Sequence, residues 1–205
     1  MSPDRAVAET GFRRIAMPDA DVFYFPRLEL GRGAADILRQ LVTEVPWRAE
    51  AVAMWGRAML QPRLTAWYGD PGSNYAYSGI RLAPLPWTPL LLEIKARVEE
   101  AAASAFNSVL INYYRDHRDS IGFHSDNEPE LGEHPVIASL SLGAERTFIF
   151  KHRTLKTAEP VRQRLGSSSL LLMAGETQRC WRHGIPKESR PCGPRVNLTF
   201  RTIFS

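Results

Sequence analysis

Two histidines and one aspartate in this chain have the types and the spacing of a metal site. A single serine separates His124 from Asp126, and His183 follows later in the chain. Alternate side chains of an extended segment point to the same side, so His124 and Asp126 can both reach one ion. Two imidazoles and one carboxylate hold a mononuclear Fe(II) on one face and leave positions open for chemistry. These residues therefore predict an iron centre.

An arginine-bounded segment, Arg195-Val-Asn-Leu-Thr-Phe-Arg201, follows His183. In a strand, Arg195, Asn197, Thr199 and Arg201 lie on one face. A guanidinium on that face can form a bidentate pair with the carboxylate of a small organic acid. A metal centre beside such a strand predicts a dioxygenase that uses 2-oxoglutarate as its co-substrate.

Each of these motifs is weak by itself, and the prediction depends on their combination. A lone His-x-Asp tripeptide usually belongs to a surface loop, and a lone histidine is more often a hydrogen-bonded core residue. Cys180 and Cys192 flank His183, but two thiols and one imidazole without a fourth nearby ligand make a zinc site improbable.

Length and composition limit the class of protein. A chain of 205 residues can form one domain with a proper core. The net charge of +4 fits a polyanionic partner such as nucleic acid, although many proteins without such a partner share it. Two cysteines imply no disulfide framework and favour a reducing compartment. We find no apolar run of about 18 residues and no signal segment, so we expect neither a membrane span nor secretion.

The elements that must position these residues are two helices and a series of short strands. Apolar residues at helical spacing predict helices over residues 33–45 and about 89–105, the second capped by Thr88. Residues 46–86 are rich in aromatics, Pro and Gly, and indicate short strands and loops. From Phe106 onward the pattern predicts strands over residues 108–114, 136–142, 146–151, 161–165, 168–173, 182–185 and 195–204. We therefore predict an α+β, mostly β fold, a double-stranded β-helix (jelly roll) with N-terminal helices packed on its outer face.

The chain resembles the AlkB family of Fe(II)/2-oxoglutarate-dependent dioxygenases, and is closest to its eukaryotic-type DNA-repair branch. The resemblance extends over about residues 50–205, and the segments that carry it are Asn112–Tyr114, Asp119–Asp126, Ala138–Gly143, Arg146–Phe150, His183 and Arg195–Arg201.

The resemblance implies roles for the residues of the predicted centre. His124, Asp126 and His183 would be the iron ligands at which the chemistry occurs, with O2 as the oxidant. The distal carboxylate of 2-oxoglutarate would pair with Arg195, helped by Tyr114. The remaining residues would surround the rest of the co-substrate: Asn112 and Arg201 near the end that chelates iron, and Asn197 and Thr199 on the same strand face.

The resemblance also implies a substrate, namely alkylated DNA with lesions of the N1-methyladenine and N3-methylcytosine type. Tyr75 and Tyr77 would contact the flipped base, and Met54 and Trp55 would fill the gap that the base leaves. Core packing of the tyrosines and packing of Trp55 on the early helix are the alternatives. Asn127 stands where relatives often carry an acidic residue, which leaves the base preference open.

The resemblance sets our expectation for the organisation of the chain. We expect a single domain over residues 1–205, with an N-terminal extension (1–105) that carries the nucleotide-recognition segment and supporting helices. Residues 106–205 would form the jelly-roll catalytic core. We expect a monomer in the cytoplasm of a bacterium or the nucleus of a eukaryote. The alternatives are the same chemistry on RNA or protein, or a catalytically silent nucleic-acid-binding module.

Overall fold

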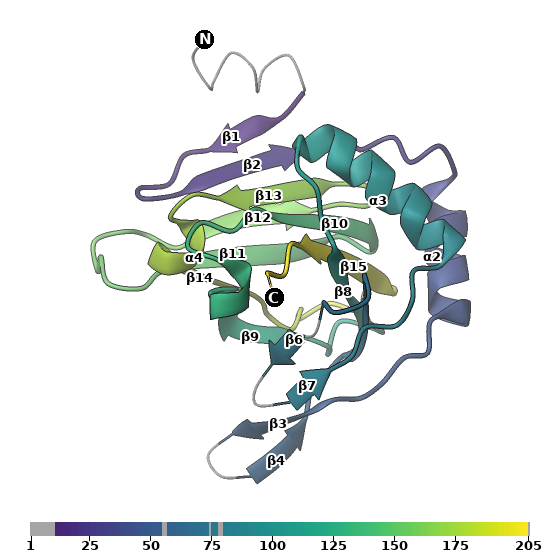
Figure 1. Cartoon of the computed structure of the whole chain (residues 1–205). Helices are drawn as coiled ribbons and strands as arrows, with labels where there is room; N and C mark the ends of the chain where they lie inside the picture. The colour runs from purple at the N-terminus through teal and green to yellow at the C-terminus, as the bar shows by residue number, and fades with distance from the viewer. Residues whose placement is uncertain (1–10, 55–56, 74, 78–79, 205) are drawn as a thin grey trace.

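Two antiparallel sheets form the framework of the protein (Figure 1). The structure is a computed structural model, and it describes residues 11–54, 57–73, 75–77 and 80–204. The larger sheet has seven strands in the order β1-β2-β13-β10-β15-β8-β5. Their bounds are Arg13–Ile15 (β1), Asp21–Phe25 (β2), Leu170–Ala174 (β13), Ile137–Gly143 (β10), Arg195–Arg201 (β15), Ser108–Tyr114 (β8) and Leu64–Gly69 (β5).

The smaller sheet has four strands in the order β12-β11-β14-β9. Their bounds are Val161–Leu165 (β12), Arg146–His152 (β11), Trp181–Ile185 (β14) and Ile121–His124 (β9). A cluster of buried side chains from both sheets includes Phe150 and Trp181 of the smaller sheet and Leu171 and Met173 of the larger one. The predicted jelly roll is therefore confirmed, because the apolar faces of the two sheets enclose a common core.

Two helices cover the outer face of the larger sheet, as the sequence predicts. They are α2 (Ala34–Glu44) and α3 (Pro89–Ala102), and the second is capped by Thr88, whose hydroxyl accepts a hydrogen bond from the backbone of Leu91 at 3.2 Å. One side of each helix is buried against the sheet in a second core cluster, which includes Ile37, Leu41, Leu91, Ile94 and Val98. The second helix ends three residues before the predicted position, since Ala103 adopts a left-handed conformation with φ of 49°.

Some elements were not predicted. Strands β1 and β2 extend the larger sheet from the N-terminal part of the chain, β9 forms the edge of the smaller sheet, and α4 (Thr177–Cys180) is a single helical turn before β14. The region from 46 to 86 does form short strands, as expected. Besides β5 it contains two hairpins, β3 (Ala51–Met54) with β4 (Arg57–Leu60) and β6 (Tyr75–Tyr77) with β7 (Ile80–Leu82), drawn at the bottom of Figure 1. Within the described ranges, no helix is long and apolar enough to cross a membrane.

Two neighbouring leucines on α3 test how this helix packs. Leu91 is fully buried, whereas Leu92 is 49% exposed. We predict that Leu91→Ala lowers the free energy of unfolding by about 2–5 kcal/mol, because it leaves a cavity against the sheet. Leu92→Ala should change it by less than about 0.5 kcal/mol. Urea unfolding of both variants measures the difference, and equal effects would mean that this face of α3 does not hold the helix to the sheet.

Candidate metal and carboxylate-binding site

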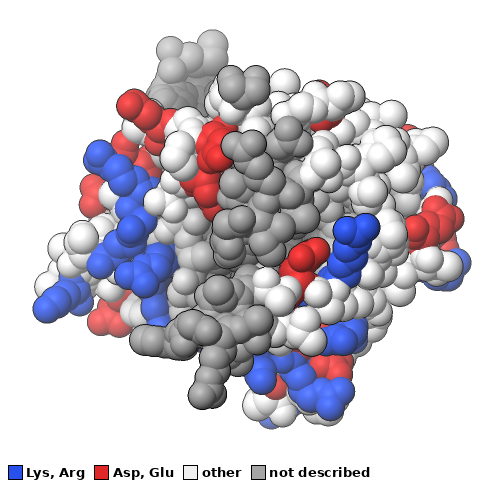
Figure 2. All heavy atoms as spheres, turned by 60° about the horizontal axis from the view of Figure 1, so that its bottom comes forward, with Lys and Arg blue, Asp and Glu red and all other residues white. Residues whose placement is uncertain are grey.

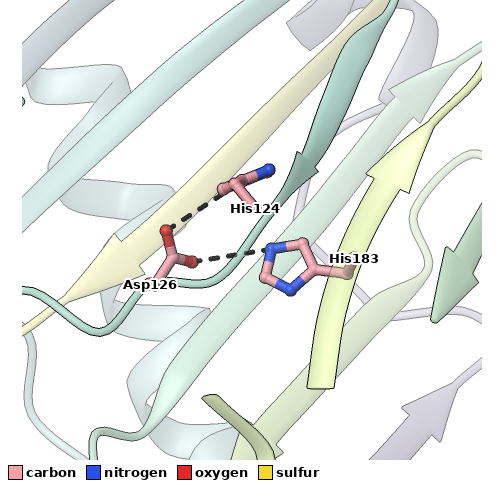
Figure 3. Close-up of side chains that lie close together, drawn as sticks. All are labelled: His124, Asp126 and His183. Carbon is pink, nitrogen blue, oxygen red and sulfur yellow. Dashed lines mark ion pairs between the residues drawn. The ribbon is translucent and has the colours of Figure 1, made fainter. Parts of the chain in front are cut away.

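The pairing of β9 with β14 brings the two histidines together. His124 and His183 are direct partners across these two strands, and their ring centroids are 4.4 Å apart. Asp126 follows β9 and turns its carboxylate toward both rings (Figure 3). Its oxygens lie 4.0 Å from Nε2 of His124 and 3.8 Å from Nε2 of His183, and one ligand atom of each residue lies within 4.8 Å of the others. The structure thus gathers the three predicted ligands at one point.

A β-bulge in β9 aims His124 at this point. His183 is opposite His124, but Ile185, two residues further on, is opposite Ile121, three residues back, so β9 carries one extra residue. Both Ile121 and His124 line the central cavity as a result. A Cβ atom on Gly184 would approach the carbonyl oxygen of Ile121 to 3.0 Å, so the close approach of the bulge favours glycine on the facing strand.

The carboxylate of Asp126 is buried and charged. Oδ1 accepts a hydrogen bond from Nη2 of Arg201 at 2.8 Å, whereas Oδ2 is buried and has no hydrogen-bond partner among the described residues. Burial by itself would raise the pKa of Asp126, but Arg201 and the two imidazoles outweigh it and bring that pKa down to about 2. One oxygen of a stable carboxylate is therefore available as a metal ligand.

Both histidines can present a nitrogen lone pair to the same point. The carbonyl oxygen of Gly122 lies 2.9 Å from Nδ1 of His124, so in the neutral ring Nδ1 carries the proton and Nε2 keeps its lone pair. Burial, followed by the nearby His124 ring, lowers the pKa of His183 to about 3. The ring of His183 is therefore neutral near pH 7, and it stacks on Phe148 with ring centroids 5.1 Å apart. Neutral imidazole is the form that binds a metal.

The polar residues of β15 share one face, and all of them are buried. Nδ2 of Asn197 donates to Oγ of Ser139 at 2.8 Å, and Oγ1 of Thr199 donates to Oδ1 of Asn197 at 2.9 Å. Asn112 of β8 is the direct partner of Asn197 across the sheet. These residues line a cavity together with the histidines and the aspartate. Its lining is Arg63, Leu110, Asn112, Tyr114, Ile121, His124, Asp126, Ser139, Phe148, Met173, His183, Ile185, Asn197, Thr199 and Arg201.

Arg195 lies behind this lining rather than in it. Its guanidinium carbon is 5.0 Å from the ring centroid of Tyr114, which does line the cavity, and its Nη2 donates to Oγ of Ser141 at 2.9 Å. Nε and Nη1 are buried without a hydrogen-bond partner in the described part of the chain. Burial lowers the pKa of Arg195 to about 10, and the nearby Tyr114 hydroxyl partly opposes this shift. A buried guanidinium with two unused donors is suited to bind a carboxylate.

Sequence reasoning missed the charged residue Arg63 among those that line the cavity. Arg63 is only 4% exposed, and its Nε donates to Oδ1 of Asn112 at 2.7 Å. It therefore orients an amide that faces the candidate metal site. Arg63, Thr65 and Trp67 are two residues apart in the sequence, and this spacing could have placed Arg63 on the same strand face as the buried Thr65 and Trp67.

The structure says less about the predicted substrate contacts. Trp55 lies outside the described residues. Tyr75 and Tyr77 belong to β6, of which the backbone alone is described. Asn127 is exposed beside Asp126 and is not part of the cavity lining.

Comparison with known proteins places this site in a family. The family model of the 2OG-Fe(II) oxygenase superfamily matches residues 21–201. The chain is 46% identical over 176 residues to mouse alpha-ketoglutarate-dependent dioxygenase alkB homolog 3, an alignment that covers 82% of this chain and 61% of that protein. It is 44% identical over 184 residues to the mouse DNA oxidative demethylase ALKBH2, and this alignment covers 85% of this chain and 77% of that protein.

A solved structure agrees with the fold. The structure of OsALKBH1 matches with a TM-score of 0.60 and 16% identity, covering 93% of this chain and 99% of that one. The chain spans 61% of the length of mouse alkB homolog 3, so the family assignment applies to the part that aligns. On this evidence the chain belongs to the 2OG-Fe(II) oxygenase superfamily and, within it, to the AlkB family.

Proposed function

We propose that this protein is an Fe(II)- and 2-oxoglutarate-dependent dioxygenase that removes alkyl groups oxidatively from the bases of DNA. The observation that carries the proposal is the set of one carboxylate and two imidazoles gathered within 4.8 Å at a cavity lined by polar side chains. Two relatives, alkB homolog 3 and the DNA oxidative demethylase ALKBH2, support the reaction type, and the name of the second supports DNA as the substrate.

The residues present fit Fe(II). His124, Asp126 and His183 would hold it through two Nε2 atoms and Oδ2, the buried oxygen that has no hydrogen-bond partner among the described residues. When bound with 2-oxoglutarate and O2, Fe(II) would supply oxidation of an N-methyl group on the base, with succinate, carbon dioxide and formaldehyde as products. Arg201 would keep the Asp126 carboxylate charged and oriented, since it already donates to the other oxygen.

The polar side of the cavity fits 2-oxoglutarate. The distal carboxylate would pair with Arg195, whose Nε and Nη1 have no acceptor among the described residues, with help from Tyr114. The metal-chelating end would lie near Asn112 and Arg201, and Asn197 and Thr199 would line the side. A bound dicarboxylate would satisfy donors that are otherwise buried and unused, which is a source of affinity.

The remaining expectations belong to the same proposal. Trp55, Tyr75, Tyr77 and Asn127 would contact the DNA. Residues 1–105 would supply the recognition segment and supporting helices, and residues 106–205 the catalytic core. We propose that the protein acts as a monomer, in the cytoplasm if it is bacterial and in the nucleus if it is eukaryotic.

The proposal is tested by turnover of a defined lesion. We expect formaldehyde and succinate in equal amounts from N1-methyladenine in single-stranded or duplex DNA, and loss of both products when iron is chelated. Succinate without formaldehyde on DNA, but with formaldehyde on methylated RNA, would move the substrate to RNA. Neither product from any nucleic acid would refute the proposal.

Removal of the carboxylate ligand is the first mutational prediction. Asp126→Ala should lower formaldehyde release by more than about 100-fold. Loss of a residue that only hydrogen-bonds a metal ligand already lowers metal affinity or activity by about 10–100-fold. Asp126→Ala should also weaken binding of Mn(II), a spectroscopic substitute for Fe(II) that can be followed by electron paramagnetic resonance. Asp36→Ala on α2, where the side chain is 60% exposed, is the matched control and should behave as wild type. Formaldehyde release by Asp126→Ala at the wild-type rate would refute this ligand assignment.

Replacement of the buried guanidinium is the second prediction. Arg195→Met should raise KM for 2-oxoglutarate by about 10-fold to 100-fold, because it removes charge-assisted hydrogen bonds to the carboxylate. Arg195→Lys should have a KM for 2-oxoglutarate between those of the wild type and Arg195→Met, since lysine keeps the charge but loses the bidentate geometry. KM is obtained from succinate release at saturating DNA, with Arg97→Met on the exposed side of α3 as control. An unchanged KM would mean that another residue holds the co-substrate.

A further inference from the structure

Besides Arg164, which is paired with Glu145, the outer face of the smaller sheet carries three basic side chains, one on each of three adjacent strands. Lys151 of β11 is the direct partner of Arg182 of β14, and Arg162 of β12 is opposite Ile149, two residues before Lys151 on β11. Side chains two residues apart in a strand share a face, so all three cations lie on it, with Lys151 directly beside Arg182 and Arg162 diagonal to Lys151. All three are exposed, whereas Ile149 between them is only 5% exposed. They give this face a basic surface.

These cations are not neutralised within the protein. None of the three side chains forms an ion pair or hydrogen bond with another described residue, whereas the side chain of Arg164, on the same strand as Arg162, is paired with Glu145. Figure 2 shows Lys and Arg side chains on the left of the view, with Asp and Glu side chains among them. Like charges this close repel each other, so an anionic partner would stabilise them.

An exposed aromatic ring completes this surface. Phe123 is 40% exposed, and Nζ of Lys151 lies 4.1 Å from its ring centroid. The bulge in β9 explains the position of Phe123, since Ile121 and His124 both line the cavity and the two residues between them are exposed. An aromatic ring beside unpaired cations is the combination that binds single-stranded nucleic acid, whose bases stack on the ring and whose phosphates contact the cations.

This surface adjoins the candidate metal site. Phe123 directly precedes His124 and Arg182 directly precedes His183, so the surface and the metal ligands occupy opposite faces of one strand pair. Strand β9 is the edge of the smaller sheet. A polynucleotide whose target base enters the cavity can therefore pass over this edge onto the outer face.

We propose that Phe123, Lys151, Arg162 and Arg182 form a platform that binds the single-stranded nucleotides flanking the target base. Phe123 stacks on one base, and the three cations bind the phosphates on either side of it. This inference rests on the proposed function, because it assumes that the substrate is a polynucleotide. The platform adds a contact outside the cavity, so the protein should bind long polynucleotides more tightly than short ones.

Binding of unmodified single-stranded DNA tests the stacking residue. We expect Phe123→Ala to weaken binding of a fluorescein-labelled 12-nucleotide strand by about 5-fold to 100-fold, the range for loss of one stacked base. Phe123→Trp should retain the affinity. The DNA should quench the tryptophan fluorescence of this variant more than it quenches that of the wild type. Phe204→Ala is the matched control, because Phe204 is 62% exposed elsewhere on the surface. Equal affinity of Phe123→Ala and wild type in fluorescence anisotropy would overturn the proposal.

The salt dependence of binding tests the cations. The double variant Lys151→Gln/Arg182→Gln should reduce the slope of log K against log salt by about 1.4, since each phosphate contact on a single strand contributes about 0.7. The control Arg39→Gln/Arg97→Gln removes the same charge from α2 and α3 and should leave the slope unchanged. An unchanged slope in the platform variant, or stronger competition by poly-glutamate than by DNA, would overturn the proposal.

Kinetics separate the platform from the proposed function. The platform variants should raise KM for a methylated 12-nucleotide strand while kcat, KM for 2-oxoglutarate and activity on a methylated trinucleotide remain as in wild type. Absence of formaldehyde with the wild-type protein, combined with the expected anisotropy changes, would refute the proposed reaction and leave the platform supported. Demethylation by the wild type with no change in the KM of platform variants would refute the platform alone.

Discussion

The register between β9 and β14 is the constraint on which the candidate site depends. It places His124 opposite His183, and the extra residue in β9 turns both His124 and Ile121 toward the cavity. A register shift of one residue would move each side chain to the other face of the sheet. Gly184 and the buried Trp181 on either side of His183 hold this register, one by allowing close backbone approach and the other by filling the core.

Buried charge is the second feature that organises the site. Asp126 and Arg201 are both buried and joined by a hydrogen bond at 2.8 Å, so each offsets the desolvation of the other. Arg195 is different, because its described surroundings contain Tyr114 and Ser141 but no carboxylate partner. Such a residue costs stability in the free protein, and a bound dicarboxylate would recover that stability through mass action.

The strand pair β9–β14 has two different faces. Its inner face carries the neutral ring of His183 and the ring of His124, which a backbone carbonyl orients. Its outer face carries Arg182 and Phe123. Because successive residues of a strand alternate between faces, a two-residue segment can contribute to both chemistry and recognition. The proposed platform and the proposed iron centre would therefore move together as one rigid unit.

The sequence by itself determined the residue types of the site, the two helices and most strands, because these depend on periodicity and local spacing. His124 and Asp126 were recognisable as a pair from alternation alone, and so was the polar face of β15. The tertiary structure decided what depends on pairing between distant segments: the position of His183 opposite His124, the contact of Arg63 with Asn112, and the placement of Arg195 behind Tyr114. It also decided the outward position of Phe123. A bulge is an extra residue in one of two paired strands, so it cannot be inferred from one strand alone.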